Sequence, residues 1–124
     1  MQNEKIYSFT DLEVWQEGHK LVLMVYKITK NFPKEELFSL TNQLRRAVVS
    51  ITSNIAEGFS RQGYKEKLQF YYMALGSLTE VQNQLLIAKD LKYLTRKDFD
   101  ILAKQIIIVH KLLNAFISKT KTYV

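Results

Sequence analysis

Apolar residues recur along the stretch QLRRAVVSITSNIAEGF at the spacing of one helix face. Within residues 43–59, successive apolar positions are separated by 4, 3, 4 and 4 residues. This period places them on a single stripe of an α-helix. We therefore predict a helix from about residue 35 to residue 58 that buries this stripe in a core. The stripe consists of Leu44, Val48, Ile51, Ile55 and Phe59.

Three further segments carry the same alternation of three- and four-residue steps. They predict helices over about residues 11–32, 64–92 and 96–118, and no stretch has the two-residue alternation of a strand. Steps of three and four are typical of helices that pack at shallow angles. Four helices of about 20–25 residues joined by short turns predict an all-α, up-down-up-down four-helix bundle. We expect one domain that spans residues 1–124.

Helix boundaries are indicated by polar residues and by the one proline. Thr10 and Glu13 have the spacing of a capping box, in which two side chains satisfy backbone N–H groups three residues apart. Thr95 and Asp98 repeat this spacing before the fourth helix. Pro33 ends the first helix, because its ring removes a backbone N–H.

The composition is typical of a soluble globular protein. Apolar residues make up 47% of the chain and charged residues 24%, with four glycines and one proline. The absence of cysteine excludes a disulfide framework and fits a reducing compartment. The first residues lack the apolar core of a signal peptide, and the apolar run 106–109 is too short to span a bilayer. We expect a cytoplasmic protein with no membrane partner.

Basic residues outnumber acidic residues, 18 to 12, which gives a formal net charge of +6. A basic surface favours a polyanionic partner, and arginine can bind phosphate through two parallel hydrogen bonds. If the bases of residues 45–67 share one continuous face, nucleic acid is the favoured partner; if they scatter or pair with acids, a protein is favoured. The candidate nucleic-acid-binding residues are Arg45, Arg46, Arg61, Lys65 and Lys67.

Polar residues flank the apolar stripe of residues 43–59. Glu57 lies in the last turn of its helix, where the dipole disfavours a carboxylate, so it needs a partner such as Arg61, Lys65 or a donor on another helix. Buried polar groups must be paired, and their pairing fixes the register of packed helices or subunits. The alternative is a binding site in which the adjacent arginine pair holds a phosphate. We favour a structural polar network made of Asn54, Glu57, Gly58 and Glu80.

The fourth predicted helix has more apolar residues than one stripe requires. Ile107, Ile108 and Leu112 lie outside its main stripe. The simpler interpretation is a wide core face. We favour a second buried surface, because an exposed apolar strip of this size usually marks a contact with a partner. These three residues are therefore candidates for an oligomer interface.

The residue types required for catalysis or metal binding are not combined in this sequence. Neither His19 nor His110 follows a glutamate by three residues, as a di-iron bundle requires. No phosphate-binding glycine loop, nucleophile elbow or zinc-ligand spacing is found. We expect a non-enzymatic protein with no cofactor and no metal.

Three segments carry a resemblance to a known family. They read FTDLEVWQEGHKLVLMVYKITKNFPKEE, LTNQLRRAVVSITSNIAEGF and YYMALGSLTEVQNQLLIAKDLKYL, and with the last helix they cover Phe9 to about Ile117. In these segments the chain resembles the bacterial four-helix-bundle proteins first noticed as reading frames in intervening sequences of 23S ribosomal RNA genes. It departs from their common Ile-Pro-Ser-Asn pattern at Thr52, which stands in place of the proline.

The resemblance also concerns assembly and partners. It implies a closed ring, typically a homopentamer, and a relation to the accessory protein of diversity-generating retroelements, a basic pentamer that binds nucleic acid and a reverse transcriptase. From charge and resemblance together, we predict a non-enzymatic, oligomeric bundle that binds RNA or DNA, with RNA favoured, through a basic surface. The alternative is a scaffold ring that binds a partner protein and has no nucleic-acid role.

Overall fold

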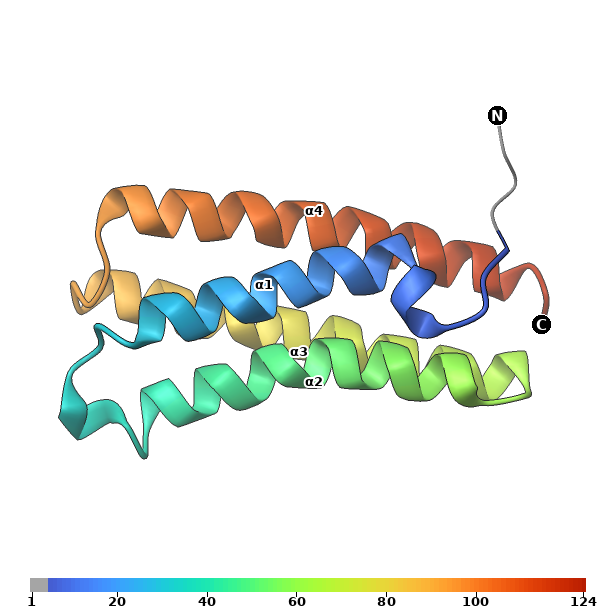
Figure 1. Cartoon of the computed structure of the whole chain (residues 1–124), viewed down its shortest axis with the longest axis horizontal. Coiled ribbons are helices and arrows are strands. Elements are labelled where there is room, and N and C mark those ends of the chain that lie inside the picture. The colour runs from blue at the N-terminus through green and yellow to red at the C-terminus, as the bar shows by residue number, and fades with distance from the viewer. Residues whose placement is uncertain (1–4) are drawn as a thin grey trace.

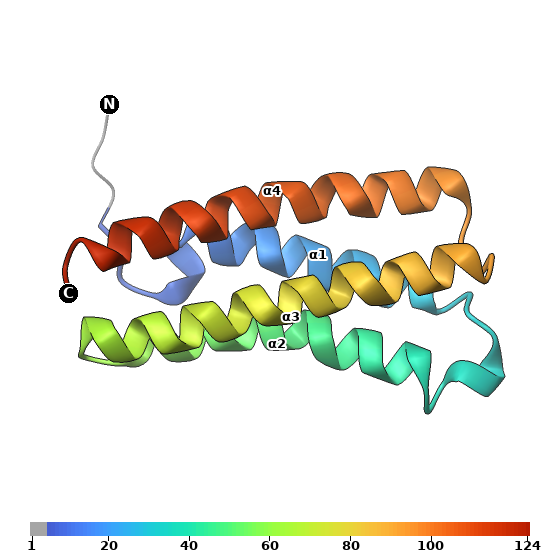
Figure 2. The same cartoon turned by 180° about the vertical axis from the view of Figure 1, so that it is seen from behind.

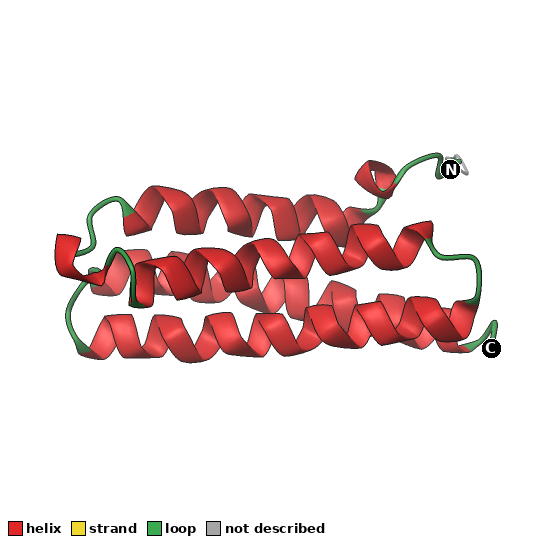
Figure 3. Cartoon of the chain, turned by 90° about the horizontal axis from the view of Figure 1, so that it is seen from below, coloured by secondary structure: helices red, strands yellow, loops and turns green. Residues whose placement is uncertain are grey.

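The computed structural model of the chain describes residues 5–124, which form four long helices joined by short turns. No strand occurs in residues 5–124, and Figure 3 shows helix and loop along this part of the chain. The predicted all-α four-helix fold is confirmed. The helices are α1 (Glu13–Thr29), α2 (Leu40–Ser60), α3 (Tyr64–Asp90) and α4 (Arg96–Lys121), with 3-10 turns η1 (Phe9–Asp11) and η2 (Lys34–Glu36) before α1 and α2.

Consecutive helices run in opposite directions and pack side by side (Figure 1). α1 contacts α2 and α4, and α3 contacts the same two helices, so the bundle is closed. From behind, α3 and α4 lie in front of α1 and α2 (Figure 2). An even number of antiparallel helices brings η1 and the end of α4 to the same end of the bundle (Figure 1).

The core is built from the predicted stripes. Leu44, Val48, Ile51 and Ile55 of α2 are fully buried, and Phe59 packs against the core from a partly exposed position. Burying one such aliphatic side chain contributes roughly 1.5–3 kcal/mol. α2 continues without a break through Thr52, because threonine keeps the backbone N–H that proline would remove.

The start of α1 differs from the prediction. Ser8 caps the first turn, where its Oγ accepts a hydrogen bond from the Thr10 N–H at 3.2 Å. Asp11 Oδ2 accepts in return from the Ser8 N–H at 3.0 Å. These bonds close η1, so α1 begins only at Glu13. The predicted Thr10–Glu13 capping box is wrong, because an equivalent box forms two residues earlier.

The start of α4 agrees with the prediction in part. Thr95 is the N-cap, and its Oγ1 accepts from the Asp98 N–H at 3.1 Å. The reciprocal bond, in which the Thr95 N–H would donate to the Asp98 carboxylate, is not formed. One backbone donor of the first turn is therefore satisfied by a side chain rather than two.

Helix α2 begins later than predicted, at Leu40 instead of residue 35. Residues 34–36 form η2, and the Tyr93 hydroxyl donates to Glu36 Oε2 at 2.8 Å. This hydrogen bond lowers the pKa of Glu36 below its ordinary value. It also fixes η2 against the loop between α3 and α4. This contact between two loops lies at the end of the bundle where α2 begins.

Helix α3 ends in a Schellman motif. The Tyr93 N–H donates to the Ala88 carbonyl and the Lys92 N–H to the Lys89 carbonyl, both at 2.9 Å. Lys92 has a φ of 64°, where glycine is the usual residue. The remaining predicted ends, residues 32, 58, 92 and 118, are found at residues 29, 60, 90 and 121.

Candidate functional site

The adjacent arginines of α2 point to different sides of the bundle. Arg45 lies toward α1, where its Nε donates to Thr29 Oγ1 at 2.9 Å. Its guanidinium carbon lies 5.0 Å from the centre of the Tyr26 ring. Arg46 is exposed and lies about 100° further around the helix. The two side chains therefore do not form one phosphate-binding group.

Two other candidate bases are engaged within the chain. Arg61 forms an ion pair with Glu57 at 3.0 Å. The Lys67 ammonium donates to the Phe59 carbonyl at 2.7 Å and to the Gly58 carbonyl at 3.4 Å. These carbonyls lie in the last turn of α2, where a cation is favoured. Burial lowers the pKa of Lys67. Lys67 stabilises the end of α2 and is not part of an exposed basic face.

Arg46 and Lys65 are the candidate bases that are exposed and have no ion pair within residues 5–124. The five candidate bases of α2, α3 and the turn between them scatter or pair within the chain, rather than sharing one continuous face. By the criterion of charge placement, this arrangement favours the protein-interaction alternative over nucleic acid.

The predicted polar network is not assembled within one chain. Asn54 Nδ2 donates to the Ser50 carbonyl at 2.8 Å and to Ser50 Oγ at 3.0 Å. Ser50 Oγ in turn lies 2.9 Å from Ser77 Oγ and joins α2 to α3. Glu57 is exposed and paired with Arg61, one of the partners expected for it, whereas Glu80 is exposed and forms no hydrogen bond within residues 5–124. Of the four predicted residues, Asn54 belongs to the Ser50–Ser77 contact between α2 and α3, and the Gly58 carbonyl accepts from Lys67 of α3.

Gly58 has a packing role. A Cβ atom on Gly58 would lie 2.6 Å from Tyr71 Cε1 and 2.9 Å from Phe70 Cβ. Such distances are far below van der Waals contact, so α3 approaches α2 here only because position 58 has no side chain. Gly58 therefore permits the short distance between α2 and α3 at this point.

The three predicted interface residues of α4 lie on two sides of the helix. Ile107 lines a groove between α3 and α4 together with Leu86. Ile108 is exposed and lies about 100° around the helix from Ile107. Leu112 packs against the core and is partly buried. Ile108 and Leu112 are four residues apart and share one side of α4, whereas Ile107 lies on another, and the oligomer interface stays a prediction.

Two grooves flank α4, and large apolar side chains contribute to the lining of both. The α3–α4 groove has a volume of about 180 Å³, and the α1–α4 groove has a volume of about 280 Å³. Leu86, Ile107 and Ile101 are 46%, 53% and 49% exposed, although all three are large apolar side chains. The α3–α4 groove is lined by Leu86, Phe99, Ala103 and Ile107 with buried neighbours, and the α1–α4 groove by Met24, Lys27, Ile28, Asn31, Asp98, Ile101 and Leu102.

α4 has a property that the short apolar run 106–109 did not indicate. By length and composition it is long and apolar enough to span a membrane, although 28% of its most apolar 18-residue stretch is buried in the bundle. Core helices of soluble proteins meet the same test. The short apolar run 106–109 thus understated the apolar character of this helix.

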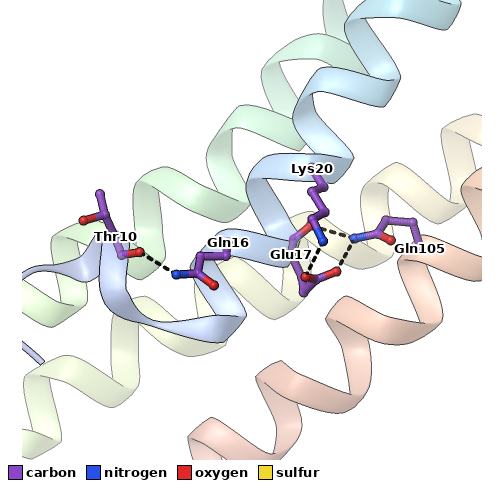
Figure 4. Close-up of polar contacts among 5 residues, drawn as sticks. All are labelled: Thr10, Gln16, Glu17, Lys20 and Gln105. Atoms are coloured by element: carbon purple, nitrogen blue, oxygen red, sulfur yellow. Dashed lines mark hydrogen bonds and ion pairs between the residues drawn. The ribbon is translucent and has the colours of Figure 1, made fainter. Parts of the chain in front are cut away.

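A polar cluster between α1 and α4 was not predicted (Figure 4). Gln105 Nε2 donates to the Glu17 carbonyl at 2.9 Å and to Glu17 Oε1 at 3.1 Å. Lys20 donates to the other carboxylate oxygen at 2.9 Å. The bonds from Lys20 and Gln105 lower the pKa of Glu17. Because the partners are 88 residues apart, no local sequence signal indicates this contact.

The structure offers no arrangement for metal chemistry in the part of the chain that it describes. No group of three His, Cys, Asp or Glu side chains comes together in residues 5–124. His19 stacks on Trp15, with 4.7 Å between the ring centres. His110 lies 3.5 Å from the Asn114 side-chain amide.

Comparisons with known proteins agree with the fold. A protein of unknown function from the S23 ribosomal protein family of Bacteroides thetaiotaomicron has a similar crystal structure, with a TM-score of 0.78 and 22% sequence identity. The similarity covers 85% of this chain and 95% of the other chain. Comparison with curated proteins gave no match. Residues 10–115 match the family model described as 23S rRNA-intervening sequence protein. Because this match covers most of the chain, the protein belongs to the 23S rRNA-intervening sequence protein family.

Proposed function

We propose that this protein is a non-enzymatic, self-assembling scaffold in which copies of the chain bind one another through the two grooves that flank α4. The observation that carries the proposal is the exposure of an apolar helix. Ile101, Ile107 and Ile108 of α4 are 49%, 53% and 38% exposed, although all three are large apolar side chains. An exposed apolar surface of this kind marks a contact with a partner.

Charge supports a protein partner over lipid for this surface. Lys104 and Lys111 are exposed on the outer side of α4. A lysine at the centre of a bilayer costs about 2.5–3.5 kcal/mol on insertion scales. Between two protein surfaces, in contrast, such side chains can remain at the solvated rim.

A second copy of the chain is the partner that the placement of the grooves supports. The α3–α4 groove and the α1–α4 groove are different patches on opposite sides of one helix. A contact between two different patches is heterologous, and it produces a ring when the rotation closes. This geometry agrees with the homopentamer that the family resemblance implies, and we expect the assembly to be cytoplasmic.

The first test is the mass in solution. We expect light scattering at micromolar concentration to give an assembly of several chains, with a mass several times the 14.6 kDa of one chain. Ile107→Lys should dissociate the assembly to a folded monomer, because Ile107 is 53% exposed and is not required for the core. Ile101→Lys tests the other groove in the same way.

The matched control is Ser118→Lys, which adds the same charge to an exposed polar position of α4. It should leave the mass unchanged. A wild-type monomer, or an Ile107→Lys variant that remains assembled, would contradict the proposal.

A second candidate function is nucleic-acid binding through α4. This helix has no acidic residue after Asp100. Lys104, Lys111 and Lys119 are exposed there and form no ion pair within residues 5–124. An unpaired basic surface attracts polyanions, so these lysines support RNA or DNA binding better than the bases of α2 and α3.

The salt dependence of binding tests this second candidate. Each phosphate contact to single-stranded RNA contributes about 0.7 to the slope of log K against log salt. Replacing Lys104 and Lys111 together by alanine should therefore reduce the slope by about 1.4. Lys20→Ala is the control, because Lys20 is paired with Glu17 at 2.9 Å. If the slope fell equally in the double variant and in the control, RNA would be attracted by the overall charge and not by contacts with Lys104 and Lys111.

A further inference from the structure

A cavity of about 500 Å³ lies at the end of the bundle where η1 and the end of α4 meet. Its walls come from η1, the end of α2, the beginning of α3 and the end of α4. The volume falls within the range of small-molecule sites, about 300–1,000 Å³. Its aromatic wall residues are Phe59, Tyr64, Tyr71, Phe116 and Tyr123.

Tyr71 brings a buried hydroxyl to this cavity. The residue is 1% exposed, and its ring packs against Phe116 with 4.6 Å between the ring centres. Its hydroxyl forms no hydrogen bond to another residue of the described chain. Because Tyr71 lines the cavity, its hydroxyl can donate to a group that enters there. Burial, with a smaller contribution from Tyr64, raises the pKa of Tyr71 to about 12, so the hydroxyl keeps its proton and donates.

Lys67 supplies a second donor one helical turn before Tyr71. Residues four apart lie on the same face of a helix, and both side chains line the cavity. An ammonium group has three N–H donors. Two of those of Lys67 point to the last carbonyls of α2, and the bond to Gly58 is long at 3.4 Å. The ammonium also lies 5.4 Å from the centre of the Phe59 ring, which belongs to the same cavity wall.

The lining also contains two acidic residues, Asp11 and Glu13, and both are exposed. Asp11 Oδ2 already accepts from the N–H groups of Tyr7 and Ser8 at 2.9 and 3.0 Å. Glu13 is exposed and, with Lys119, also lines the adjoining groove between η1 and α4, which places both at the rim. The α3 side of the cavity therefore combines aromatic walls with two hydrogen-bond donors.

We propose that this cavity binds a small planar aromatic carboxylate, whose ring packs on the aromatic wall and whose carboxylate accepts from the Tyr71 hydroxyl and the Lys67 ammonium. Aromatic rings contact one another favourably in offset or edge-on arrangements, with about 4.5–7 Å between centres. Hydrogen bonds from a cation to a carboxylate are about twice as strong as neutral ones. The site is separate from the grooves beside α4, so it does not depend on the proposed assembly.

Titration calorimetry with 2-naphthoate tests the proposal. We expect saturable binding of one molecule per chain. Two comparators keep the ring and change the charge: the neutral 2-naphthalenemethanol and the cationic 2-naphthylmethylamine. Both should bind at least about tenfold more weakly than 2-naphthoate, because neither offers a charged acceptor to the two donors.

Tyr71→Phe removes the hydroxyl and keeps the ring, and it should weaken 2-naphthoate binding about tenfold. Lys67→Met keeps the apolar stem and should cause a loss of similar size, with the melting temperature recorded to follow the end of α2. Lys30→Met removes an exposed lysine at the end of α1 and should bind as the wild type does.

Three results would contradict the proposal that the cavity binds an aromatic carboxylate. They are 2-naphthoate binding that does not saturate, binding no tighter than that of the neutral alcohol, and binding unchanged in both Tyr71→Phe and Lys67→Met. The assembly experiment can fail without affecting these titrations, and the reverse also holds.

Discussion

Replacing Leu78 by alanine is expected to lower the free energy of unfolding by about 2–5 kcal/mol. Leu78 is fully buried in α3 and belongs to the core cluster. The substitution removes apolar atoms that folding takes out of water, and it leaves a cavity that the surrounding helices fill only in part. Urea denaturation, followed by circular dichroism at a fixed protein concentration, measures the change.

Leu23→Ala is the matched control for this prediction. The same atoms are removed from α1, but Leu23 is 57% exposed. The free energy of unfolding should change by no more than about 0.5 kcal/mol. If Leu78→Ala had an effect as small as Leu23→Ala, position 78 would not be part of a packed core.

Gly58→Ala should lower the free energy of unfolding by about 1–3 kcal/mol. The added Cβ would lie 2.6 Å from Tyr71 Cε1, and Tyr71 is buried and cannot move aside without displacing its neighbours. Alanine is favoured over glycine within a helix by about 1 kcal/mol, so the clash must exceed this gain. Thermal and urea denaturation both measure the net effect.

Gly76→Ala provides the opposite expectation. Gly76 is exposed within α3, and a Cβ there would have no neighbour within 4 Å. The substitution should therefore raise the free energy of unfolding by about 0.5–1 kcal/mol through helix propensity alone. A change of the same sign at positions 58 and 76 would contradict the close approach of α2 and α3.

The helices could be predicted because burial imposes the period that the sequence displays. Ile51 and Ile55 lie four residues apart on one helix face, and both are core residues because that face is buried. Helix starts were less predictable. Thr10 has the right spacing for a cap, but Ser8 competes for the same turn, and Glu36 is held by Tyr93 from another part of the chain. Such competition is decided by tertiary contacts that no local pattern records.

The candidate site was predicted less well than the fold, since a sequence gives charges but not their partners. The ion pair of Arg61 with Glu57 follows helical spacing, and the sequence did identify Arg61 as a partner for this carboxylate. The bonds of Arg45 to Thr29 and of Lys67 to Phe59 join separate segments, so they had no such signal.

The surface of α4 is a different case. Consecutive helical residues lie about 100° apart, so Ile107 and Ile108 face different neighbours, whereas Ile108 and Leu112 share one side. The sequence gives these directions, but it does not give which helix packs on each side of α4. Ser50 and Ser77, which do join α2 to α3, are small residues of a kind common on any helix surface.

The order of the helices has a consequence for folding. Each helix packs against the next one in the chain, and among the helix pairs of residues 5–124 only α1 and α4 are distant in sequence. Their contact closes a loop that contains α2 and α3. The entropic cost of closing such a loop rises slowly with its length, as (3/2)RT ln n for n residues. Contacts between sequence neighbours form faster than such distant ones. The topology therefore favours a sequence of events in which local hairpins form first and α4 docks on α1 last, a step that the Gln105–Glu17 hydrogen bonds complete.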